Sequence, residues 1–253
     1  VSFSSEAALV KGYKFIPKEF SLSAYKFLWL KRATILRAYG LTILVTVVGT
    51  AANLLLTSLF AYPLSRKDFK RRNLFAFILF FTCLFNGGMT ASYIVWTQLF
   101  HIKNTVWAYI LPGSLMGAMN VLMVRNYYNA NIPYAIIEAA RIDGANSWQM
   151  LWKVTIPNMM SSFTICIFLT LTNGFKLFDQ NLALTGGRPF LQQPDGSVIK
   201  TTEMMALNIY NAFYSGGGNN RGVGQAKAVV FFILVAVIGL IQLQSTRKKE
   251  VQQ

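Results

Sequence analysis

Long apolar runs separated by short polar segments make up most of this chain. A membrane-spanning helix needs about 20 predominantly apolar residues, and several runs reach that length. Polar segments and helix-breaking Pro or Gly residues separate the runs. The pattern predicts an all-α polytopic membrane protein, a single transmembrane domain over 1–253. Its predicted spans cover about 39–64, 73–98, 105–125, 159–184 and 226–244.

Composition supports the same class. The 253 residues are 54% hydrophobic and 13% charged, whereas a soluble domain carries about 25% charged residues. Cys83 and Cys166 both fall within apolar runs and are too few for a disulfide framework or a Cys-rich metal site. His101 is the only histidine and has neither a Cys nor a carboxylate beside it. We therefore expect no metal site, no cofactor and no catalytic centre in this chain.

The distribution of charge predicts the orientation in the membrane. The net charge is +15, and much of the Lys and Arg flanks apolar runs, which indicates the lipid bilayer rather than nucleic acid as the partner. Segment 65–72 holds five basic residues against one acidic, and the C-terminal tail is also basic. Both then face the cytoplasm, as does loop 126–158, whereas 1–39 and 185–224 face outward. The seven basic residues of 1–39 run against this orientation, but the rule governs long segments weakly.

One loop is amphipathic rather than simply polar. In 138–157, "EAARIDGANSWQMLWKVTIP", and just before it, apolar residues recur at helical spacing. They are Ile137, Ala140, Ala145, Trp148, Leu151 and Trp152. Such a stripe packs against a partner, or it rests on the protein's own helices or on lipid. Its spacing alone favours neither alternative.

Punctuating residues divide this loop into two helices. Pro133 is placed for the first turn of a helix. Gly144 follows Asp143 in a turn sequence and is free to adopt positive φ. Either Asn146 or Ser147 can cap a second helix. Pro157 separates that helix from the next span, so the loop reads as helix, glycine turn, helix.

The spacing of this loop resembles a known signature. Glu138, Ala139 and Ala140 precede Gly144 by the spacing of the E-A-A-x3-G-x9-I-x-L-P motif of ABC importer permeases. The motif ends here at Pro157, with Val154 in place of Ile and Ile156 in place of Leu. The cytoplasmic position, two spans from the C-terminus, is also similar to that family.

Further segments resemble the carbohydrate-uptake branch, the maltose-type permeases. They are "FIPKEFSLSAYKFL", "TNGFKLFDQNLALTGGRPF" (172–190) and "RKKEV". The element "LTGGRP" is similar to LTGGGP of that branch, with Arg188 in place of a Gly. Together these segments extend over nearly the whole chain. The resemblance also implies a sixth span ahead of Val1.

The resemblance implies an ATP-driven, binding-protein-dependent importer in a prokaryotic cell membrane. Its partners would be a second homologous permease, two ATP-binding cassette subunits, an extracellular solute-binding protein and a carbohydrate. The amphipathic loop would dock on the ATP-binding subunit and transmit its movement. Residues implied in that coupling are Glu138, Ala139, Ala140, Asp143, Gly144, Trp148 and Pro157. ATP and Mg would bind to the partner, because this chain has no G-x-x-x-x-G-K-[ST] sequence.

Polar residues within the predicted spans are candidates for the substrate pathway. Asn173, Lys176 and Asp179 are spaced three apart on the predicted fourth span, interleaved with Phe175 and Phe178. Aromatic faces next to amide and charged groups suit a sugar. The alternative is that Lys176 and Asp179 only neutralise each other along the helix.

Other solutes and mechanisms remain open at this point. Asn53, Asn86 and Asn120 lie in other spans and serve either the pathway or helix–helix hydrogen bonding. An importer of the same class for peptides, amino acids or phosphate is the first alternative function. An ion-coupled secondary transporter is the second, and it leaves the amphipathic loop without a role. A membrane enzyme has no nucleophile–base pair or metal ligands to support it.

Overall fold

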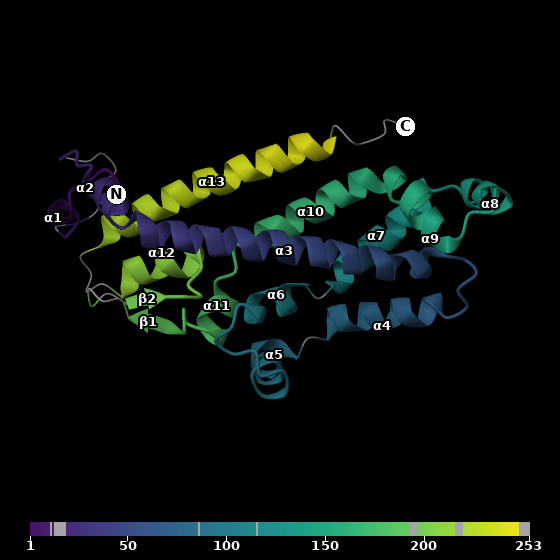
Figure 1. The fold of residues 1–253 in the computed structure, drawn as a ribbon, viewed down its shortest axis with the longest axis horizontal. Helices are drawn as coiled ribbons and strands as arrows, with labels where there is room; N and C mark the ends of the chain where they lie inside the picture. Colours follow the sequence, from purple (N-terminus) through teal and green to yellow (C-terminus); the bar gives the residue numbers. More distant parts are fainter. Residues whose placement is uncertain are drawn as a thin grey trace. The chain divides into compact units, whose positions relative to one another are not determined.

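The computed structural model describes residues 1–10, 12, 19–85, 87–114, 116–192, 196, 198–215 and 220–247, and these are mainly helical (Figure 1). One short antiparallel hairpin is present, in which Leu191 pairs with Ile199. The helices are α1 (Glu6–Val10), α2 (Ser23–Leu30), α3 (Arg32–Ser65), α4 (Arg72–Leu84), α5 (Gly88–Ile94), η1 (Val95–Leu99), α6 (Trp107–Ser114), α7 (Ala118–Asn131), α8 (Tyr134–Ile142), α9 (Ser147–Gln149), η2 (Met150–Thr155), η3 (Pro157–Met159), α10 (Met160–Phe175), α11 (Asp179–Leu184), α12 (Met205–Tyr214) and α13 (Arg221–Arg247), and the strands are β1 (Phe190–Gln192) and β2 (Val198–Lys200).

Helices lie over each of the five predicted spans. In the described residues two single helices, α3 and α13, are long and apolar enough to cross a membrane. Three bent pairs of helices raise that number to five if each pair is one span. Several boundaries differ from the prediction: α3 begins at Arg32, before 39, α7 continues to Asn131, beyond 125, and α13 covers Arg221–Arg247 rather than 226–244. The helices over 73–98 and over 105–125 are also each broken, with bends of 112° and 43°. An α helix does not have to stop where its apolar stretch stops, because the backbone bonds are internal to the helix.

The prediction of one helix over 159–184 is wrong. Helix α10 ends at Phe175 and α11 begins at Asp179. The chain passes very close to α3 at the end of α10, where a Cβ on Gly174 would lie 2.8 Å from Cγ2 of Thr46. The last turn is tightened by a bond of 3.1 Å from Lys176 N–H to the Asn173 carbonyl. Asn173, Lys176 and Asp179 therefore do not share one helix.

Contacts divide the chain into two compact units, and the boundaries between them fall within the helices α3, α5, α6, α10 and α13. The first comprises residues 1–47, 92–110 and 173–238. In this unit α12 is fixed on α3, because the Met205 N–H donates to the buried Thr42 hydroxyl at 3.0 Å. Tyr39 and Met205 pack in one small apolar cluster, and Val45, Tyr109 and Met204 pack in another.

The second unit comprises residues 48–91, 111–172 and 239–253 and contains the largest apolar core. In it α4 packs against α7. The buried members of this core are Ala61, Leu64, Val121, Val124, Tyr128, Ile132, Ile137, Met150, Met159, Phe163 and Cys166. The core thus joins the end of α3 to α7, α8 and α10.

Apolar side chains also cover outer surfaces. Phe77 on α4 is 63% exposed and Phe232 on α13 is 73% exposed. Large exposed apolar faces are disfavoured in water and suit a lipid environment. The all-α polytopic membrane class predicted from the sequence is confirmed by the similar structures reported below.

Candidate functional site

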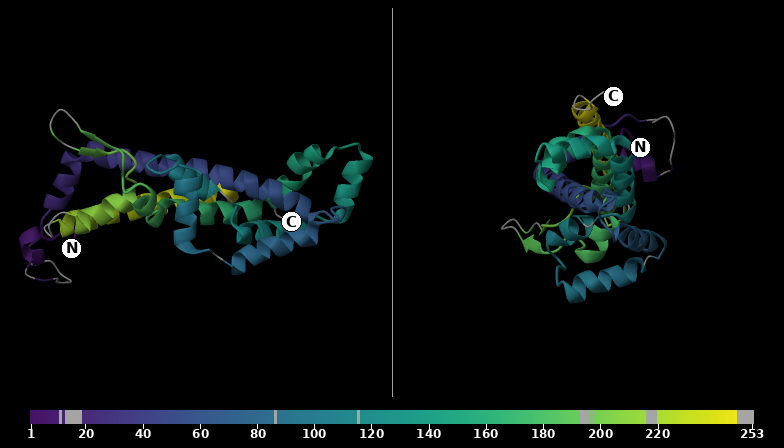
Figure 2. Two further views of the ribbon diagram at one scale, coloured as in Figure 1. Left: turned by 90° about the horizontal axis from the view of Figure 1, so that it is seen from below. Right: turned by 90° about the vertical axis from the view of Figure 1, so that its right-hand side faces the viewer.

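The amphipathic loop folds as two helical pieces joined by a glycine turn, and we call residues 133–159 the EAA segment (Figure 2). Helix α8 begins directly after Pro133, which is its N-cap with φ −56° and ψ 136°, so the proline lies one residue before the first turn in which the sequence placed it. It closes with two backbone bonds, Gly144 N–H to Arg141 O at 3.0 Å and Ala145 N–H to Ala140 O at 2.9 Å. This is a Schellman motif, which needs a left-handed residue after the cap. Gly144 has φ +79°, so the predicted turn conformation is confirmed.

The second piece begins with a reciprocal cap. The Asn146 side chain accepts from Gln149 N–H at 2.7 Å, and the Gln149 side chain accepts from Asn146 N–H at 3.0 Å. Of the two caps that the sequence allowed, the structure therefore uses Asn146. The helical path bends by 47° at Pro157, between Ser147–Thr155 and Pro157–Phe175. Proline removes a backbone donor and accounts for a bend at this place.

The apolar stripe divides into an inner and an outer part. Ile137 and Leu151 are buried, and Ala140 and Ala145 pack against the core of the second unit. These side chains attach the EAA segment to its own helices. Leu151 is 3% exposed, so it is unavailable as an anchor for another protein.

The outer part of the segment is apolar and accessible. Trp148 is 60% exposed and Trp152 is 45% exposed, with ring centroids 5.6 Å apart in an edge-on arrangement. Ile142 is 86% exposed at the end of α8. Glu138 is exposed on the same helix, one turn before Ile142. Sequence reasoning missed Ile142; an apolar residue away from the buried stripe was the signal that could have found it.

The end of α3 and the turn after it contact both halves of the EAA segment. Asp68 forms an ion pair with Arg141 of α8. The Tyr62 hydroxyl donates to the Ser147 carbonyl at 3.2 Å, and Arg66 Nη2 donates to that hydroxyl at 2.7 Å. These three contacts lie within the second unit.

The candidate pathway residues of 173–179 lie from the end of α10 to the start of α11, and they differ in exposure. Asn173, Lys176 and Asp179 are exposed, and no ion pair joins Lys176 to Asp179 in the described part of the chain. Phe175 is 2% exposed with its ring edge-on to Phe231, so its face is closed to a ligand here. Phe178 is half-buried and lies 4.9 Å from the Tyr210 ring.

The asparagines of the other spans differ in their surroundings. Asn53 is buried, and its side-chain amide donates to the Gly113 carbonyl at 3.4 Å. The sequence left two roles open for Asn53, the substrate pathway and helix–helix hydrogen bonding, and this bond supports the second. Asn120 is half-buried on α7. Asn86 lies outside the described residues.

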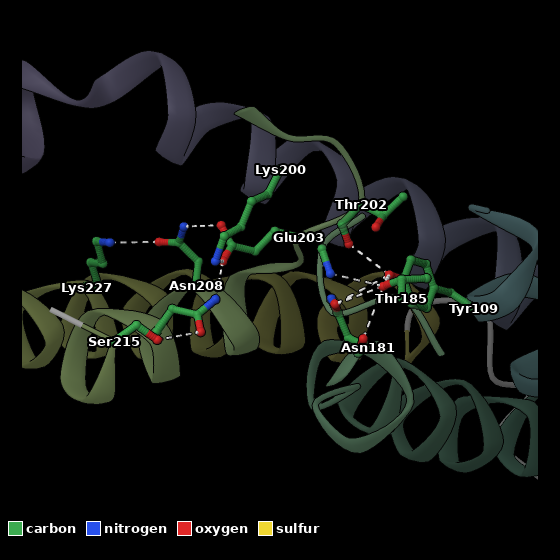
Figure 3. Close-up of polar contacts among 11 residues, drawn as sticks. Tyr109, Asn181, Thr185, Lys200, Thr202, Glu203, Asn208, Ser215 and Lys227 are labelled. Carbon is green, nitrogen blue, oxygen red and sulfur yellow. Dashed lines mark hydrogen bonds and ion pairs between the residues drawn. The ribbon is translucent and has the colours of Figure 1, made fainter. Parts of the chain in front are cut away.

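A polar network that sequence reasoning missed secures the "LTGGRP" element in the first unit (Figure 3). The Tyr109 hydroxyl donates to the Thr202 carbonyl at 2.8 Å, also contacts the Thr185 hydroxyl, and lies 3.3 Å from Oδ1 of the fully buried Asn181. These residues come from separate segments of the sequence. No local pattern in the sequence marks such a cluster.

A second network surrounds the buried carboxylate of Glu203 (Figure 3). Lys200 Nζ lies 3.2 Å away and Asn208 Nδ2 donates at 2.8 Å. Lys227 donates in turn to Asn208 at 2.8 Å. These partners offset the cost of burying the Glu203 charge, and the contacts join the end of β2 to α12 and α13. Among the described residues, no group of three or more His, Cys, Asp or Glu could hold a metal ion.

Comparison with known proteins identifies the class. Residues 54–249 match the family model described as binding-protein-dependent transport system inner membrane component. The chain is also similar to a solved structure described as a bacterial ABC transporter involved in the import of the acidic polysaccharide alginate. That similarity has a TM-score of 0.74 and 26% identity, and it covers 99% of this chain and 87% of the other. The fold is that of an ABC importer permease.

Two curated relatives are also transport system permease proteins. The probable starch degradation products transport system permease protein AmyD of Thermoanaerobacterium thermosulfurigenes is 36% identical over 225 residues, 85% of this chain and 73% of that protein. The polygalacturonan/rhamnogalacturonan transport system permease protein YtcP of Bacillus subtilis is 35% identical over 168 residues, 66% of this chain and 57% of that protein. The chain belongs to the family of binding-protein-dependent transport system inner membrane components, whose members are transport permeases.

Proposed function

We propose that this chain forms half of the translocation pathway of an ATP-driven importer for a sugar or oligosaccharide. It works by alternating access in the cytoplasmic membrane of a prokaryote. The family match supports the importer class. The relatives named above are described for starch degradation products, polygalacturonan or rhamnogalacturonan, and alginate, all saccharides, which supports the cargo.

The EAA segment is the proposed coupling element to an ATP-binding subunit. The observation that carries this coupling role is an accessible apolar surface on a segment that is packed on its own core. Ile142 and Trp148 are exposed, whereas Ile137 and Leu151 are buried and attach the segment to its own helices. Interfaces draw most of their energy from a few aromatic and apolar anchors, and a nearby charge sets the register. Glu138 supplies that charge.

The motif residues have distinct proposed roles in coupling. Ala139 is small and exposed and allows close approach of the partner. Gly144 with Asp143 closes α8, and Pro157 sets the bend toward α10. Ala140 faces inward and fixes α8 on the core. The full proposed set is Glu138, Ala139, Ala140, Asp143, Gly144, Trp148 and Pro157.

Partners supply the remaining functions. A second homologous permease completes the pathway, two cassette subunits bind ATP and Mg, and an extracellular solute-binding protein delivers the carbohydrate. The basic segment 65–72 and the EAA segment face the cytoplasm. The 185–224 loop, held by the Tyr109 and Glu203 networks, faces outward and contacts the binding protein.

The substrate pathway is proposed to include exposed polar residues near the end of α10. Asn173, Lys176 and Asp179 are accessible there, and the Phe178 and Tyr210 rings lie beside one another. Amide and charged groups meet sugar hydroxyls, and aromatic faces contact the C–H surfaces. Asn120 is proposed as a further polar lining residue on α7.

Reconstitution of the whole complex tests this function. Proteoliposomes with the binding protein and ATP should accumulate a radiolabelled oligosaccharide and not an amino acid. Glu138→Lys should abolish uptake while the binding protein still binds the sugar. Uptake driven by an ion gradient without ATP, or normal uptake by Glu138→Lys, would contradict the proposal.

A further inference from the structure

Tyr62, close to the end of α3, contacts the EAA segment through its hydroxyl and α7 through its ring. The hydroxyl donates to the Ser147 carbonyl at 3.2 Å and accepts from Nη2 of Arg66 at 2.7 Å. The Arg66 guanidinium also lies over the Tyr62 ring, 4.4 Å from its centroid. The Tyr128 ring on α7 is edge-on to the Tyr62 ring, with the centroids 6.2 Å apart. All four residues belong to the second unit.

The two hydrogen bonds of the Tyr62 hydroxyl can be arranged in one order only. A guanidinium has donors and no acceptor, a backbone carbonyl only accepts, and a phenol has one proton. Arg66 therefore occupies an acceptor position of the Tyr62 oxygen, and the Tyr62 proton lies toward Ser147. A charged donor on this oxygen polarises the O–H group and strengthens the bond that the group donates. We call these two bonds, from Arg66 through Tyr62 to Ser147, the Tyr62 link.

The acceptor of the Tyr62 link belongs to the peptide unit that carries Trp148. Ser147 is the first residue of α9, and its carbonyl lies in the same planar peptide as the Trp148 N–H. A hydrogen bond to that carbonyl therefore limits rotation of the backbone at Trp148. Trp148 is the exposed side chain proposed above as an anchor for the ATP-binding subunit. The link thus connects the backbone of this anchor to α3.

The other end of the Tyr62 link is attached to a helix that is long and apolar enough to cross a membrane. Helix α3 covers Arg32–Ser65, and Tyr62 lies in its last turn. The end of α3 is also bonded to α7, because Nε of Arg125 donates to the Leu64 carbonyl at 3.2 Å. Hydrogen-bond networks and rigid helices are physical means by which separate parts of a protein are coupled.

The other contacts of the EAA segment differ from this link. The burial of Ile137 and Leu151 attaches the segment to its core, but apolar burial is non-directional. The Asp68–Arg141 ion pair acts on α8. The Tyr62 link acts on α9, on the other side of the Gly144 turn, and its geometry is directional.

We propose that Tyr62 is a positioning residue for coupling, and that the Tyr62 link transmits the displacement of Trp148 by the ATP-binding subunit to α3. This inference rests on the proposed function, because it needs the subunit at Trp148. It extends that function by assigning the transmission to one hydroxyl group outside the EAA segment. A tyrosine that only stabilised the fold would affect unfolding temperature and yield. A tyrosine that transmits movement affects the number of sugar molecules transported per ATP hydrolysed.

The variant Tyr62→Phe isolates the hydroxyl. It keeps the ring, with its contacts to the Arg66 guanidinium and the Tyr128 ring, and removes both bonds of the link. The complete complex in proteoliposomes is assayed for uptake of a radiolabelled oligosaccharide and for ATP hydrolysis stimulated by the binding protein. Tyr62→Phe should retain the ATP-binding subunit and hydrolyse ATP. It should transport about fivefold less sugar per ATP, the factor that one hydrogen bond represents.

The matched control is Tyr128→Phe. The Tyr128 side chain lies in the same core, and its hydroxyl donates to the Ser58 carbonyl of α3 at 3.5 Å rather than to the EAA segment. Tyr128→Phe should therefore leave the sugar transported per ATP unchanged. An unchanged ratio in Tyr62→Phe, equal losses in the two variants, or loss of the ATP-binding subunit from Tyr62→Phe would overturn the inference and leave the importer function standing. Absence of ATP-driven uptake in the wild-type complex would instead remove the proposed function, and this role with it.

Discussion

Asp68 and Arg141 form an ion pair that joins the turn after α3 to helix α8 of the EAA segment. Both side chains are about half exposed, at 51% and 47%. An exposed pair of this kind contributes about 0–1 kcal/mol to stability. We therefore assign the contact a role in orienting α8 rather than in stabilising the protein.

The first prediction follows from this pair. Asp68→Arg places two guanidinium groups together and should reduce sugar uptake several-fold through like-charge repulsion, with little change in thermal stability. Asp68→Arg combined with Arg141→Asp restores opposite charges and should recover most of the uptake. Transport by reconstituted complexes measures both. Failure of the exchanged pair to recover uptake would show that the two charges act independently.

The second prediction concerns the turn at Gly144. Its φ is +79° and an added Cβ would meet nothing within 4 Å. Gly144→Ala should therefore cost about 1–2 kcal/mol through backbone conformation alone. Because the strain acts where α8 meets α9, the loss of uptake should be larger than that caused by an equally destabilising change elsewhere in the chain. Parallel measurement of unfolding temperature and uptake tests this.

Gly88 offers a matched control. Its φ is also +79° and an added Cβ would meet nothing within 4 Å, but it lies at the start of α5, outside the EAA segment. Gly88→Ala should show a similar change in stability with normal uptake. Equal losses of uptake in the two variants would mean that strain anywhere in the chain impairs transport.

These residues show what the sequence can predict and what it cannot. The glycine turn, the Asn146 cap and the Pro157 bend depend on neighbours within a few residues, so local sequence specifies them. The close packing of Gly174, near the end of α10, against Thr46 involves a helix that is distant in the sequence. A hydrophobicity pattern carries no information on that packing.

The candidate site too could be predicted only in part from the sequence. The helical spacing of the apolar stripe could be predicted, but which of its members is buried, as Leu151 is, and which is exposed, as Trp148 is, follows from the core of the second unit. Ile142 is an apolar residue off that stripe, and the structure adds that its side chain is exposed. The Tyr109 network joins residues from three segments, which no single segment specifies.

The third prediction concerns the outer apolar surface. Trp148→Ala removes a side chain that is 60% exposed and so should leave the stability of the permease unchanged. If Trp148 is an interface anchor, the cost to assembly should be about 2 kcal/mol or more, a loss of at least tenfold in affinity for the ATP-binding subunit. Co-purification and ATPase activity stimulated by the binding protein report the effect.

Trp29 provides the comparison for that variant. It is 73% exposed on α2, in the segment predicted to face outward. Trp29→Ala should therefore leave association with the ATP-binding subunit intact. If both tryptophan variants lose the subunit equally, or if Trp148→Ala retains it fully, the EAA segment is not the docking surface.

The fourth prediction concerns the break between α10 and α11. A Cβ on Gly174 would lie 2.8 Å from Cγ2 and 3.1 Å from Oγ1 of Thr46. Gly174→Ala should therefore destabilise the protein by about 1–3 kcal/mol, the usual cost of overpacking a closely packed site. Thr46→Ala removes both of these atoms, and the double variant should regain most of the lost stability. Thermal unfolding of the single and double variants in one detergent gives the interaction energy. Additive losses would show that the Thr46 side chain is not what opposes a Cβ at position 174.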